Sequence, residues 1–417
     1  MKSRKTLLLA LGVCGCFALG FSWRDIQRGE LPSGRSVNNL FGVQRMPTDA
    51  APDQTFKQNF NLIRSEYMRP VKSEDLKYAG IGGMVSSLGD PHTIFMVPRQ
   101  AQAFNDETRA NFFGVGARLQ PDPLGARLFT VFDDGPAFRA GLRAGMIITA
   151  VDGKSVGGTP VDNIVSKIKG PEGTLVRLTV TSGKSAKPIT FTVRRARILA
   201  PTVENGKYFA ESKVGYLSLT QFSEPTLEQF DRELTKLEKR ELHGLIIDLR
   251  GNGGGLLETA KDLLGRFVEN KVVVKMKLRD GHEEVVKTPY GTTHDFDYPV
   301  VVLINEDSAS ASEIFAGCLR DYRKATLVGE HSYGKASVQN VFQLVDQASA
   351  KITIAKYFLP MTGDISRKVD EDGVYVSGGL KPDVEVELDP NAGEIVPGDP
   401  KTDNQLRKAI EVVLSKR

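Results

Sequence analysis

The sequence predicts a multidomain α+β protein, in which a helical N-terminal segment precedes a β-rich domain and an α/β domain with a mixed sheet. Length is the first reason, because 417 residues exceed one ordinary domain. The periodicity of the apolar residues is the second. It follows helical spacing between Gln54 and Ala103, changes to strand-like alternation between Asn111 and Ile198, and alternates between strands and helices from Pro201 onward.

Composition places the chain among ordinary soluble globular proteins. Charged residues make up 25% and hydrophobic residues 40% of the sequence, both near the averages for such proteins. The net charge of +4 is small for this length, and the sequence has no basic stripe with interleaved aromatic residues. We therefore expect no nucleic-acid partner.

The first 25 residues have the pattern of an export signal. The basic start Lys2-Ser3-Arg4-Lys5 precedes an apolar run, 7–21, that is shorter than the ~20 residues of a membrane-spanning helix. Ala18-Leu19-Gly20 offers a small-x-small cleavage site. We therefore expect an exported protein of the periplasm or cell envelope, membrane-anchored or secreted. Residues 1–25 are then a signal peptide or an N-terminal anchor, and the second would associate the protein with the membrane.

The three cysteines do not predict an internal disulfide. Cys14 and Cys16 lie in the export segment, where a lipid-anchored cysteine is a further option, although neither has a convincing lipobox. Only Cys318 then remains in the mature chain. Residues 26–54 contain Gly, Pro, Ser and Asn without a period and are predicted to be a linker.

Residues 55–104 are predicted to form a helical cap or dimerisation region, so a homo-oligomer is expected. A second short helix is predicted around 76–88, and Gly89-Asp90-Pro91-His92-Thr93 then turns the chain. The first helix is predicted because apolar residues recur at steps of three and four: Phe56, Phe60, Ile63 and Tyr67.

Residues 105–198 contain an ordered set of strands, small-residue turns and one helix at about 161–169. The run from Pro136 through Gly141-Leu142 and Gly145-Met146 to Val151-Asp152-Gly153 resembles a PDZ domain of the bacterial protease type. In such a domain the turn formed by Gly114, Val115 and Gly116 receives the terminal carboxylate of a peptide. Successive backbone N–H groups can hold an anion there, while the adjoining strand edge pairs with the peptide backbone. A G-x-G turn alone is more often only a turn.

A serine-rich corner in the second half is the first candidate for chemistry. The apolar run 301–304 predicts a buried strand, and Ser308-Ala309-Ser310-Ala311-Ser312-Glu313 begins a helix. A serine at such a corner lies at the positive end of the helix, which stabilises a developing oxyanion. A second strand, 325–329, leads into the loop 330–339. We expect these two loops to meet, since they follow neighbouring strands.

The glycine-rich loop after Asp248 invites comparison with nucleotide-binding sites. It lacks the spacing of a P-loop and of a dinucleotide-binding turn, so we expect no cofactor. Gly253 to Gly255 are better suited to point backbone N–H groups into a cleft as oxyanion donors.

A serine hydrolase needs a base, and two candidates remain open. Of the five histidines only His331 lies near the serine corner in sequence, which allows a Ser-His-Asp triad without a motif to favour it. Lys335 is the stronger candidate, because a lysine among small and apolar neighbours has its pKa lowered by desolvation. Gln339 lies four residues on and could hold the amine. The alternative is that Lys335 is an ordinary solvated surface charge.

These motifs together resemble the C-terminal processing peptidases, or tail-specific proteases, over about 54–390. The resemblance implies that Ser310 is the nucleophile, Lys335 the general base and Gln339 its orienting partner. It also implies an oxyanion hole made by Ala311 and Gly255, or Gly254, and a ClpP/crotonase-like core at 199–390 followed by a C-terminal tail helix at 391–417. The motifs that carry it appear in the family's order: Asp-Leu-Arg-x-Asn-Gly-Gly-Gly at 248–255, Ser-Ala-Ser-Ala-Ser-Glu-Ile at 308–314, Gly-Lys-x-Ser-Val-Gln at 334–339 and Gly-x-Lys-Pro-Asp at 379–383.

The resemblance implies an exported serine endopeptidase that captures protein substrates by their C-terminal ends, with or without an adaptor or activator protein. Two positions depart from the family pattern: Ala336 replaces a usual second glycine, and Lys169 stands where some members carry an arginine between the two domains. The second departure leaves control of the protease by the PDZ domain open. The alternatives are a non-catalytic PDZ adaptor and an enzyme that uses the same dyad on esters.

Overall fold

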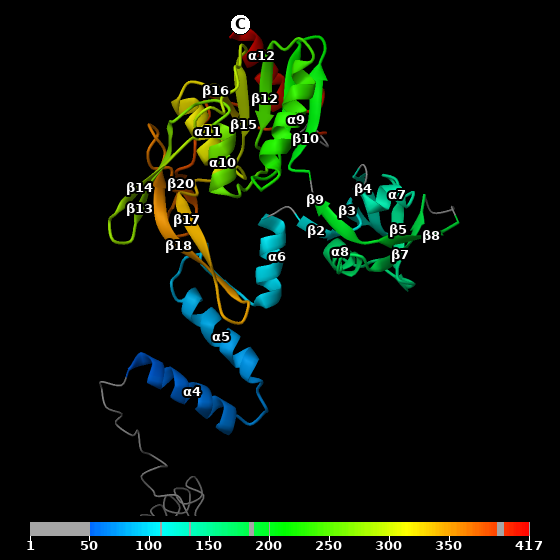
Figure 1. The fold of residues 1–417 in the computed structure, drawn as a ribbon, viewed down its shortest axis with the longest axis vertical. Helices are drawn as coiled ribbons and strands as arrows, with labels where there is room; N and C mark the ends of the chain where they lie inside the picture. The colour runs from blue at the N-terminus through cyan, green and yellow to red at the C-terminus, as the bar shows by residue number, and fades with distance from the viewer. Residues whose placement is uncertain are drawn as a thin grey trace, which may run out of the picture. The chain divides into compact units, whose positions relative to one another are not determined.

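The structure, a computed structural model, describes residues 51–108, 111–132, 135–182, 187–199, 201–389 and 396–416 (Figure 1). The predicted export signal at 1–25 and most of the predicted linker at 26–54 lie outside the described residues. Within the described ranges, no helix combines the length and apolar character needed to cross a membrane.

The chain divides into two units after Gly80. The described part of the first contains helix α4 (Pro52–Glu66) and the start of α5 (Ser73–Ser86). α4 begins with Pro52, whose ring suits the first helical turn. Neither helix has a buried residue, and apolar side chains such as Phe56 and Leu62 are about half exposed at 45% and 55%. These two helices therefore do not form a core of their own.

The β-rich domain has its own core, built from apolar residues of its strands and of helix α8 (Val161–Ile168). Leu128, Ile148, Ile164 and Leu178 are fully buried in it. The sheet order is β3-β4-β5-β7-β8 with β6 on β5, and β2 pairs with β9 in a separate ribbon. The elements are β2 (Asn111–Gly114), β3 (Ala117–Asp122), β4 (Gly125–Val131), α7 (Pro136–Arg139), β5 (Ile147–Val151), β6 (Lys154–Ser155), α8 (Val161–Ile168), β7 (Leu175–Thr181), β8 (Ile189–Arg194) and β9 (Ala196–Leu199).

The α/β domain is built on a six-stranded sheet in the order β10-β11-β12-β15-β16-β21. All of its pairs are parallel except β10 with β11. The carboxyl ends of β12, β15 and β16 therefore lie at one edge, where the glycine-rich loop, the serine corner and the lysine loop begin. The strands are β10 (Val203–Phe209), β11 (Val214–Leu219), β12 (Gly244–Asp248), β15 (Val300–Ile304), β16 (Ala325–Gly329) and β21 (Val384–Glu385).

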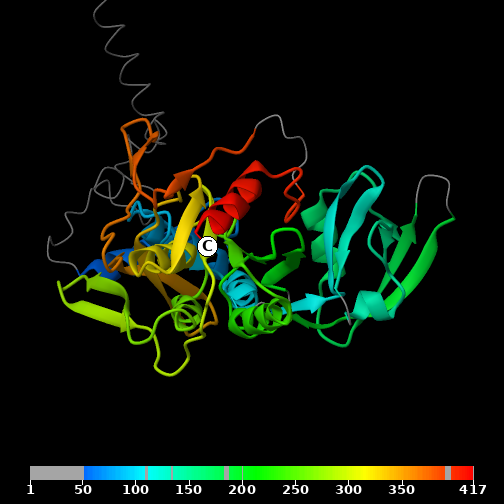
Figure 2. The same cartoon turned by 90° about the horizontal axis from the view of Figure 1, so that it is seen from above.

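Helices cover both faces of this sheet, which explains why its strands read as continuous apolar runs. Leu245 and Ile247 of β12 pack with three helices on one face, whereas Ile246 packs with α12 on the other (Figure 2). The helices are α9 (Thr226–Glu238), α10 (Leu257–Leu264), α11 (Ala311–Asp321) and α12 (Asn404–Ser415).

A second, antiparallel sheet carries the strand that follows the lysine loop. Its order is β1-β18-β13-β14, with β17 on β18. The N-terminal segment is thus not helical throughout: β1 joins this sheet before helix α6 (Pro98–Thr108). The other strands are β1 (Ile94–Met96), β13 (Val272–Leu278), β14 (Glu283–Lys287), β17 (Ser337–Gln343) and β18 (Ser349–Phe358), and β19 (Lys368–Val369) pairs with β20 (Tyr375–Ser377).

A buried ion-pair network fixes α12 to the end of β12. The Arg250 guanidinium donates to Asp248 and to Asp403, in each case with one oxygen at 2.6 Å, and also to Gln405 at 2.8 Å. Asp403 is fully buried and caps α12 through the N–H of Leu406. The glycine-rich loop starts directly after Arg250, so the tail helix helps to hold the strand end from which that loop leaves.

We predict that Asp403→Ala lowers the free energy of unfolding by about 3–5 kcal/mol, because it leaves a buried guanidinium without one of its carboxylates. Urea denaturation followed by circular dichroism measures this. Lys408→Ala is the matched control: its exposed pair with Glu411 at 3.0 Å should contribute less than about 1 kcal/mol. Equal losses in the two variants would contradict the structural role of the network.

Candidate active site

The serine corner holds Ser310 in a strained backbone conformation. Ser310 caps α11 with φ 58° and ψ −115°, a region that non-glycine residues rarely occupy. Two hydrogen bonds of Ser308 fix the turn before Ser310. The Ser308 hydroxyl donates to Leu249 O at 2.9 Å and accepts from Asn305 N–H at 3.0 Å. Such a corner lifts one side chain out of the sheet edge and leaves the first N–H groups of the helix without helical partners.

The glycine-rich loop lies directly against this corner. A Cβ on Gly254 would fall 2.6 Å from Ala309 O and 2.9 Å from Ala311 N, so only glycine permits this approach. Asn252 joins the two loops, because its backbone oxygen accepts from Ala309 N–H at 3.1 Å and its side chain accepts from Gly254 N–H at 2.9 Å. The backbone groups predicted to hold an oxyanion are therefore neighbours in space.

Glu313 connects the serine corner to the lysine loop. One carboxylate oxygen accepts from Ser310 N–H at 2.8 Å and from Lys335 N–H at 2.9 Å. The other accepts from the Ser332 hydroxyl at 2.5 Å and from Gly334 N–H at 2.6 Å. Glu313 is fully buried, and burial raises its pKa, but four donors around two oxygens match the ionised carboxylate.

A buried tyrosine gives the two loops a second link. The Tyr357 hydroxyl donates to Lys335 O at 2.6 Å and lies 3.5 Å from Ser310 O. Burial raises the pKa of Tyr357 well above its ordinary value, so it remains a donor at any physiological pH. The backbones of Ser310 and Lys335 are thus held through two shared partners.

The side chain of Lys335 is half-buried, and burial is the largest cause that lowers its pKa below 10.5. The nearby positive charge of Lys351 lowers this pKa further, whereas the carboxylates of Glu313 and Asp90 oppose the shift. A lysine in these surroundings carries a larger neutral fraction near neutral pH than an exposed one.

The amide of Gln339 is held by two hydroxyl groups of the antiparallel sheet. Its amide nitrogen donates to the Ser337 hydroxyl at 2.9 Å and to the Thr353 hydroxyl at 3.1 Å. In the described part of the chain, no hydrogen bond joins it to Lys335. The role of Gln339 as the orienting partner of Lys335 therefore stays a prediction, and the two hydroxyl groups are the partners that hold its amide.

One cavity of about 740 Å³ lies over these loops. Phe104 and Asn105 of α6, Lys351 of β18 and the segment 220–222 complete its wall. The structure brings to this cavity every residue predicted to take part in catalysis: Ser310, Ala311, Lys335, Gln339, Gly254 and Gly255.

Comparisons with known proteins agree with the motifs. The carboxy-terminal processing protease CtpB of Bacillus subtilis (strain 168) is 34% identical over 331 residues, which span 79% of this chain and 68% of that protein. The chain belongs to the C-terminal processing peptidases. A CtpA-like serine protease of Staphylococcus aureus (strain MRSA252) is 32% identical over 82% of this chain and 66% of its own length. The resemblance seen in the sequence is thus confirmed.

Three families match parts of this serine-type peptidase. Peptidase family S41 matches 213–386, the PDZ domain 130–182, and the N-terminal domain of the activating protease CtpB 14–99. A solved S41 protease from Bacteroides fragilis NCTC 9343 has 17% identity, covers 93% of this chain and 100% of its own, and gives a TM-score of 0.51. That likeness shows the shared fold, so the predicted fold class is confirmed.

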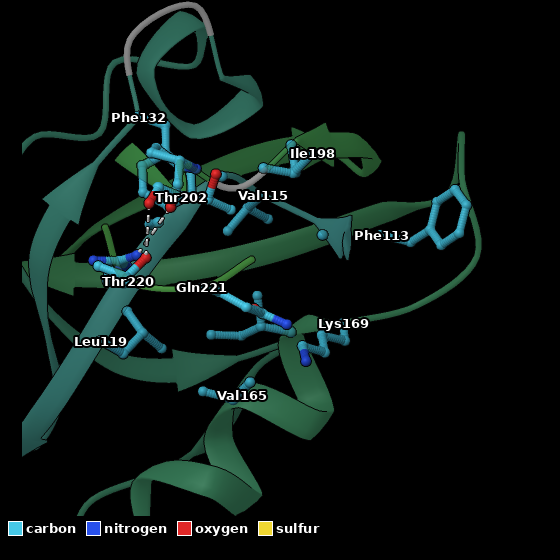
Figure 3. Close-up of a pocket in the computed structure, with 16 residues that line it drawn as sticks. Phe113, Val115, Leu119, Phe132, Val165, Lys169, Ile198, Thr202, Thr220 and Gln221 are labelled. Carbon is cyan, nitrogen blue, oxygen red and sulfur yellow. Dashed lines mark hydrogen bonds between the residues drawn. The ribbon is translucent and has the colours of Figure 1, made fainter. Parts of the chain in front are cut away.

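The PDZ domain of this peptidase contributes to a second cavity, of about 250 Å³ (Figure 3). The predicted carboxylate turn of Gly114, Val115 and Gly116 lines it. The other wall comes from the α/β domain and includes Thr220 and Gln221. Its remaining lining is mainly apolar and includes Leu119, Phe132, Val165, Ile168 and Ile198, with Lys169 at one side.

The histidines lie elsewhere. None of the five, all of which fall in the described part of this peptidase, lines the cavity over Ser310. His331 instead has Nε2 3.8 Å from a carboxylate oxygen of Glu385. A Ser-His-Asp triad built on His331 is therefore not supported by the geometry.

Sequence reasoning did not assign roles to Glu313, Tyr357 or Thr353. The spacing of Ser310 and Glu313 is that of a capping box, so the sequence allows a helix-capping role for Glu313 to be predicted. The hydrogen bonds from the lysine loop to Glu313 cannot be predicted in this way, because they depend on how β15 and β16 pair. The contacts of Tyr357 and Thr353 follow from the register of β18, which local pattern does not reveal.

We predict that Glu313→Gln reduces kcat on an unfolded protein substrate by about 10²-fold, since misplacing catalytic groups by about 1 Å has effects of that size. The amide presents donors to backbone N–H groups and loses part of the four-bond arrangement. Steady-state kinetics measures the loss. Glu306→Gln, at an exposed position of the same corner, should keep the wild-type rate. Wild-type kcat in Glu313→Gln would show that the carboxylate is not needed to hold the two loops.

Proposed function

We propose that this peptidase is an exported endopeptidase with a Ser310/Lys335 dyad, and that its PDZ domain captures substrates by their C-terminal ends. One observation carries the catalytic part: Ser310 and a half-buried Lys335 with a lowered pKa line the same cavity, beside glycine-loop and helix N–H groups. This is the combination that a serine nucleophile needs when no histidine is at hand.

The reaction follows from these groups in two stages. Lys335, when neutral, takes the proton of the Ser310 hydroxyl as its oxygen attacks a peptide carbonyl, and the ammonium then donates that proton to the leaving amine. The resulting acyl-enzyme is an ester of Ser310. Lys335 next takes a proton from water, the hydroxide attacks the ester, and the proton returns to Ser310 as the new carboxyl end leaves.

The developing oxyanion would be held by Ala311 N–H and Gly255 N–H. Ala311 is the first residue of α11, where N–H groups lack helical acceptors and the helix dipole is positive. Gly254 is the weaker candidate, because its N–H already donates to the Asn252 side chain. Two preorganised donors of this kind are a large contribution to acyl-transfer catalysis.

The turn at 114–116 is proposed as the receptor for the substrate carboxylate. Its glycine at 116 has φ 78°, which lets consecutive N–H groups converge, and the apolar wall around Val165 and Ile198 suits an apolar last residue. Capture of the chain end there would raise the local concentration of the polypeptide at the catalytic cavity.

Export and self-association are proposed on separate grounds. Export rests on the sequence of residues 1–25, and removal of these residues should leave the protein in the cytoplasm on cell fractionation. Self-association rests on α4 and α5, which bury none of their residues within the chain. Gel filtration with light scattering tests it, and a monomer at micromolar concentration would contradict it.

Two alternatives use the same residues differently. A non-catalytic PDZ adaptor would bind C-terminal peptides and leave casein intact, and an esterase would hydrolyse small esters while sparing polypeptides. The lowered pKa of Lys335 beside Ser310 favours the peptidase over the adaptor.

We predict that Ser310→Ala and Lys335→Met each reduce turnover of an unstructured protein by more than about 10³-fold without loss of folded structure. In the wild type, kcat/KM should rise with pH, because only the neutral amine of Lys335 can act as the base. The midpoint of this rise should lie below 10.5, because the pKa of Lys335 is lowered. A pH series with casein and labelling by a fluorophosphonate probe measure both effects. Full activity in either variant would refute the dyad.

We predict that blocking the substrate carboxylate weakens capture. A protein with an amidated C-terminus should be cut about tenfold less efficiently than the same protein with a free one, mainly through KM, since the carboxylate contributes binding rather than chemistry. Mass spectrometry of the products at limiting substrate measures this ratio. Equal cutting of the two forms would remove carboxylate recognition from the proposal.

A further inference from the structure

A further cavity, of about 660 Å³, borders the lysine loop, and its volume lies in the range of ligand sites. Lys335 and Ser337 line both this cavity and the cavity over Ser310. Its other walls come mainly from β13, β18 and the segment 366–369. The two cavities therefore meet at the loop that carries the proposed base.

The charged side chains that line this cavity are all basic. Its described lining residues include no aspartate or glutamate. One of the cations has an acidic partner, since Lys356 pairs with Asp364 at 2.9 Å. His92 adds little charge near neutral pH, because burial and the charge of Lys335 lower its pKa. The basic residues of the lining are Lys277, Arg279, Lys335, Lys356 and Arg367.

Two of these lysines repel each other across the sheet. Lys277 on β13 and Lys356 on β18 stand directly opposite in the antiparallel ladder. Side chains at opposite positions lie on the same face, where like charges destabilise the pair. Lys277 forms no ion pair with any described residue. The pair therefore does not stabilise the sheet, and an anion bound over it would turn the repulsion into attraction.

Arg367 is held against the lysine loop with its guanidinium unpaired. Its backbone N–H donates to Gly334 O at 2.7 Å. The guanidinium carbon lies 5.1 Å from the ring centre of Tyr333 and 5.1 Å from that of Tyr375. No described carboxylate pairs with it. A guanidinium stacked on aromatic rings keeps a fixed fork of donors, which suits a carboxylate bound through two parallel hydrogen bonds.

The rest of the lining favours a polypeptide over other anions. Apolar side chains lie among the cations, including Leu278, Ile354 and Val369, so a chain with both acidic and apolar residues matches this wall. A nucleic acid would need aromatic faces on which its bases stack. Tyr333 is the one Phe, Tyr or Trp side chain among the described lining residues, and Arg367 already covers its ring.

We propose that this cavity, called the basic cavity below, holds an acidic segment of the substrate polypeptide while the chain is cut in the cavity over Ser310. The proposal rests on the proposed function, because it takes Ser310 as the place of cleavage. It adds a preference for acidic sequence to the recognition of the chain end. The shared lining of the two cavities allows one polypeptide to occupy both.

The experiment compares two fluorogenic peptides of equal length that share one cleavable segment. One carries glutamates on both sides of this segment, and the other carries glutamines at the same positions. At low ionic strength kcat/KM of the full-length enzyme should be about tenfold higher for the acidic peptide, mainly through KM, since several exposed ion pairs of modest strength act together. In 1 M NaCl, where the screening length is about 3 Å, the two values should become nearly equal.

Charge-neutralising variants locate the preference. The double variant Lys277→Gln, Arg279→Gln should lower the ratio of the two kcat/KM values to less than about twofold. Lys287→Gln is the matched control and should keep the wild-type ratio. Lys287 is an exposed lysine of β14 that stands opposite Val272, at the other end of β13, and it does not line the basic cavity.

Thermal melting separates binding from folding. The single variant Lys277→Gln should melt no lower than the wild type, because it removes one member of a like-charge pair. A clear fall in melting temperature would mean that Lys277 supports the sheet, and it would contradict the repulsion on which the proposal depends.

The outcomes separate this inference from the proposed function. Equal cutting of the two peptides by the wild type, or an unchanged ratio in the double variant, refutes the basic cavity even if Ser310→Ala and Lys335→Met are inactive. Oligothymidylate that inhibits cleavage of the neutral peptide as well as the acidic peptide does would mark a general polyanion site and also refute it. If Ser310→Ala and Lys335→Met remain active, the dyad is wrong, whereas a preference lost in the double variant still assigns the acidic segment to this cavity.

Discussion

The buried carboxylate of Glu313 is the constraint on which the site depends. Ser310 and Lys335 lie in loops that leave neighbouring parallel strands, and strand pairing alone leaves the ends of such loops free. Two oxygens that accept from both loops remove that freedom, and the four bonds reduce the cost of burying the charge. Loss of any one donor would expose the carboxylate to an environment that does not solvate it.

The electrostatics around Lys335 combine opposing demands. In its proposed role as the base, Lys335 must lose its proton near neutral pH, which burial and the charge of Lys351 favour. It must also attract a proton strongly enough to take one from a serine hydroxyl, which the carboxylates of Glu313 and Asp90 favour. A pKa between these limits suits general base catalysis, and the positions of these charges set it.

The sequence was sufficient to predict the fold class and the candidate site residues, but not most of the hydrogen bonds that hold those residues in place. The apolar runs at 301–304 and 325–329 were recognisable as buried strands. The serine corner and the lysine loop follow these two strands, so the sequence predicted that they lie beside each other. It missed β1, whose three residues are too few to show a period and whose pairing with β18 is set by tertiary contacts. The bonds of Glu313, Tyr357 and Thr353 depend on strand register, which one sequence does not encode locally. Whether Gln339 touches the amine stays a prediction.

The anchoring of the last helix makes the candidate site depend on a part of the chain that lines no wall of its cavity. Arg250 precedes the glycine-rich loop, and one of its two carboxylate partners, Asp403, lies 153 residues later, where it caps α12. A proteolytic cut between the core and α12 would remove no residue of the cavity, yet it would release this carboxylate from the guanidinium. The glycine-rich loop would then leave a strand end that has lost part of its support, so such a nick would weaken the site from a distance.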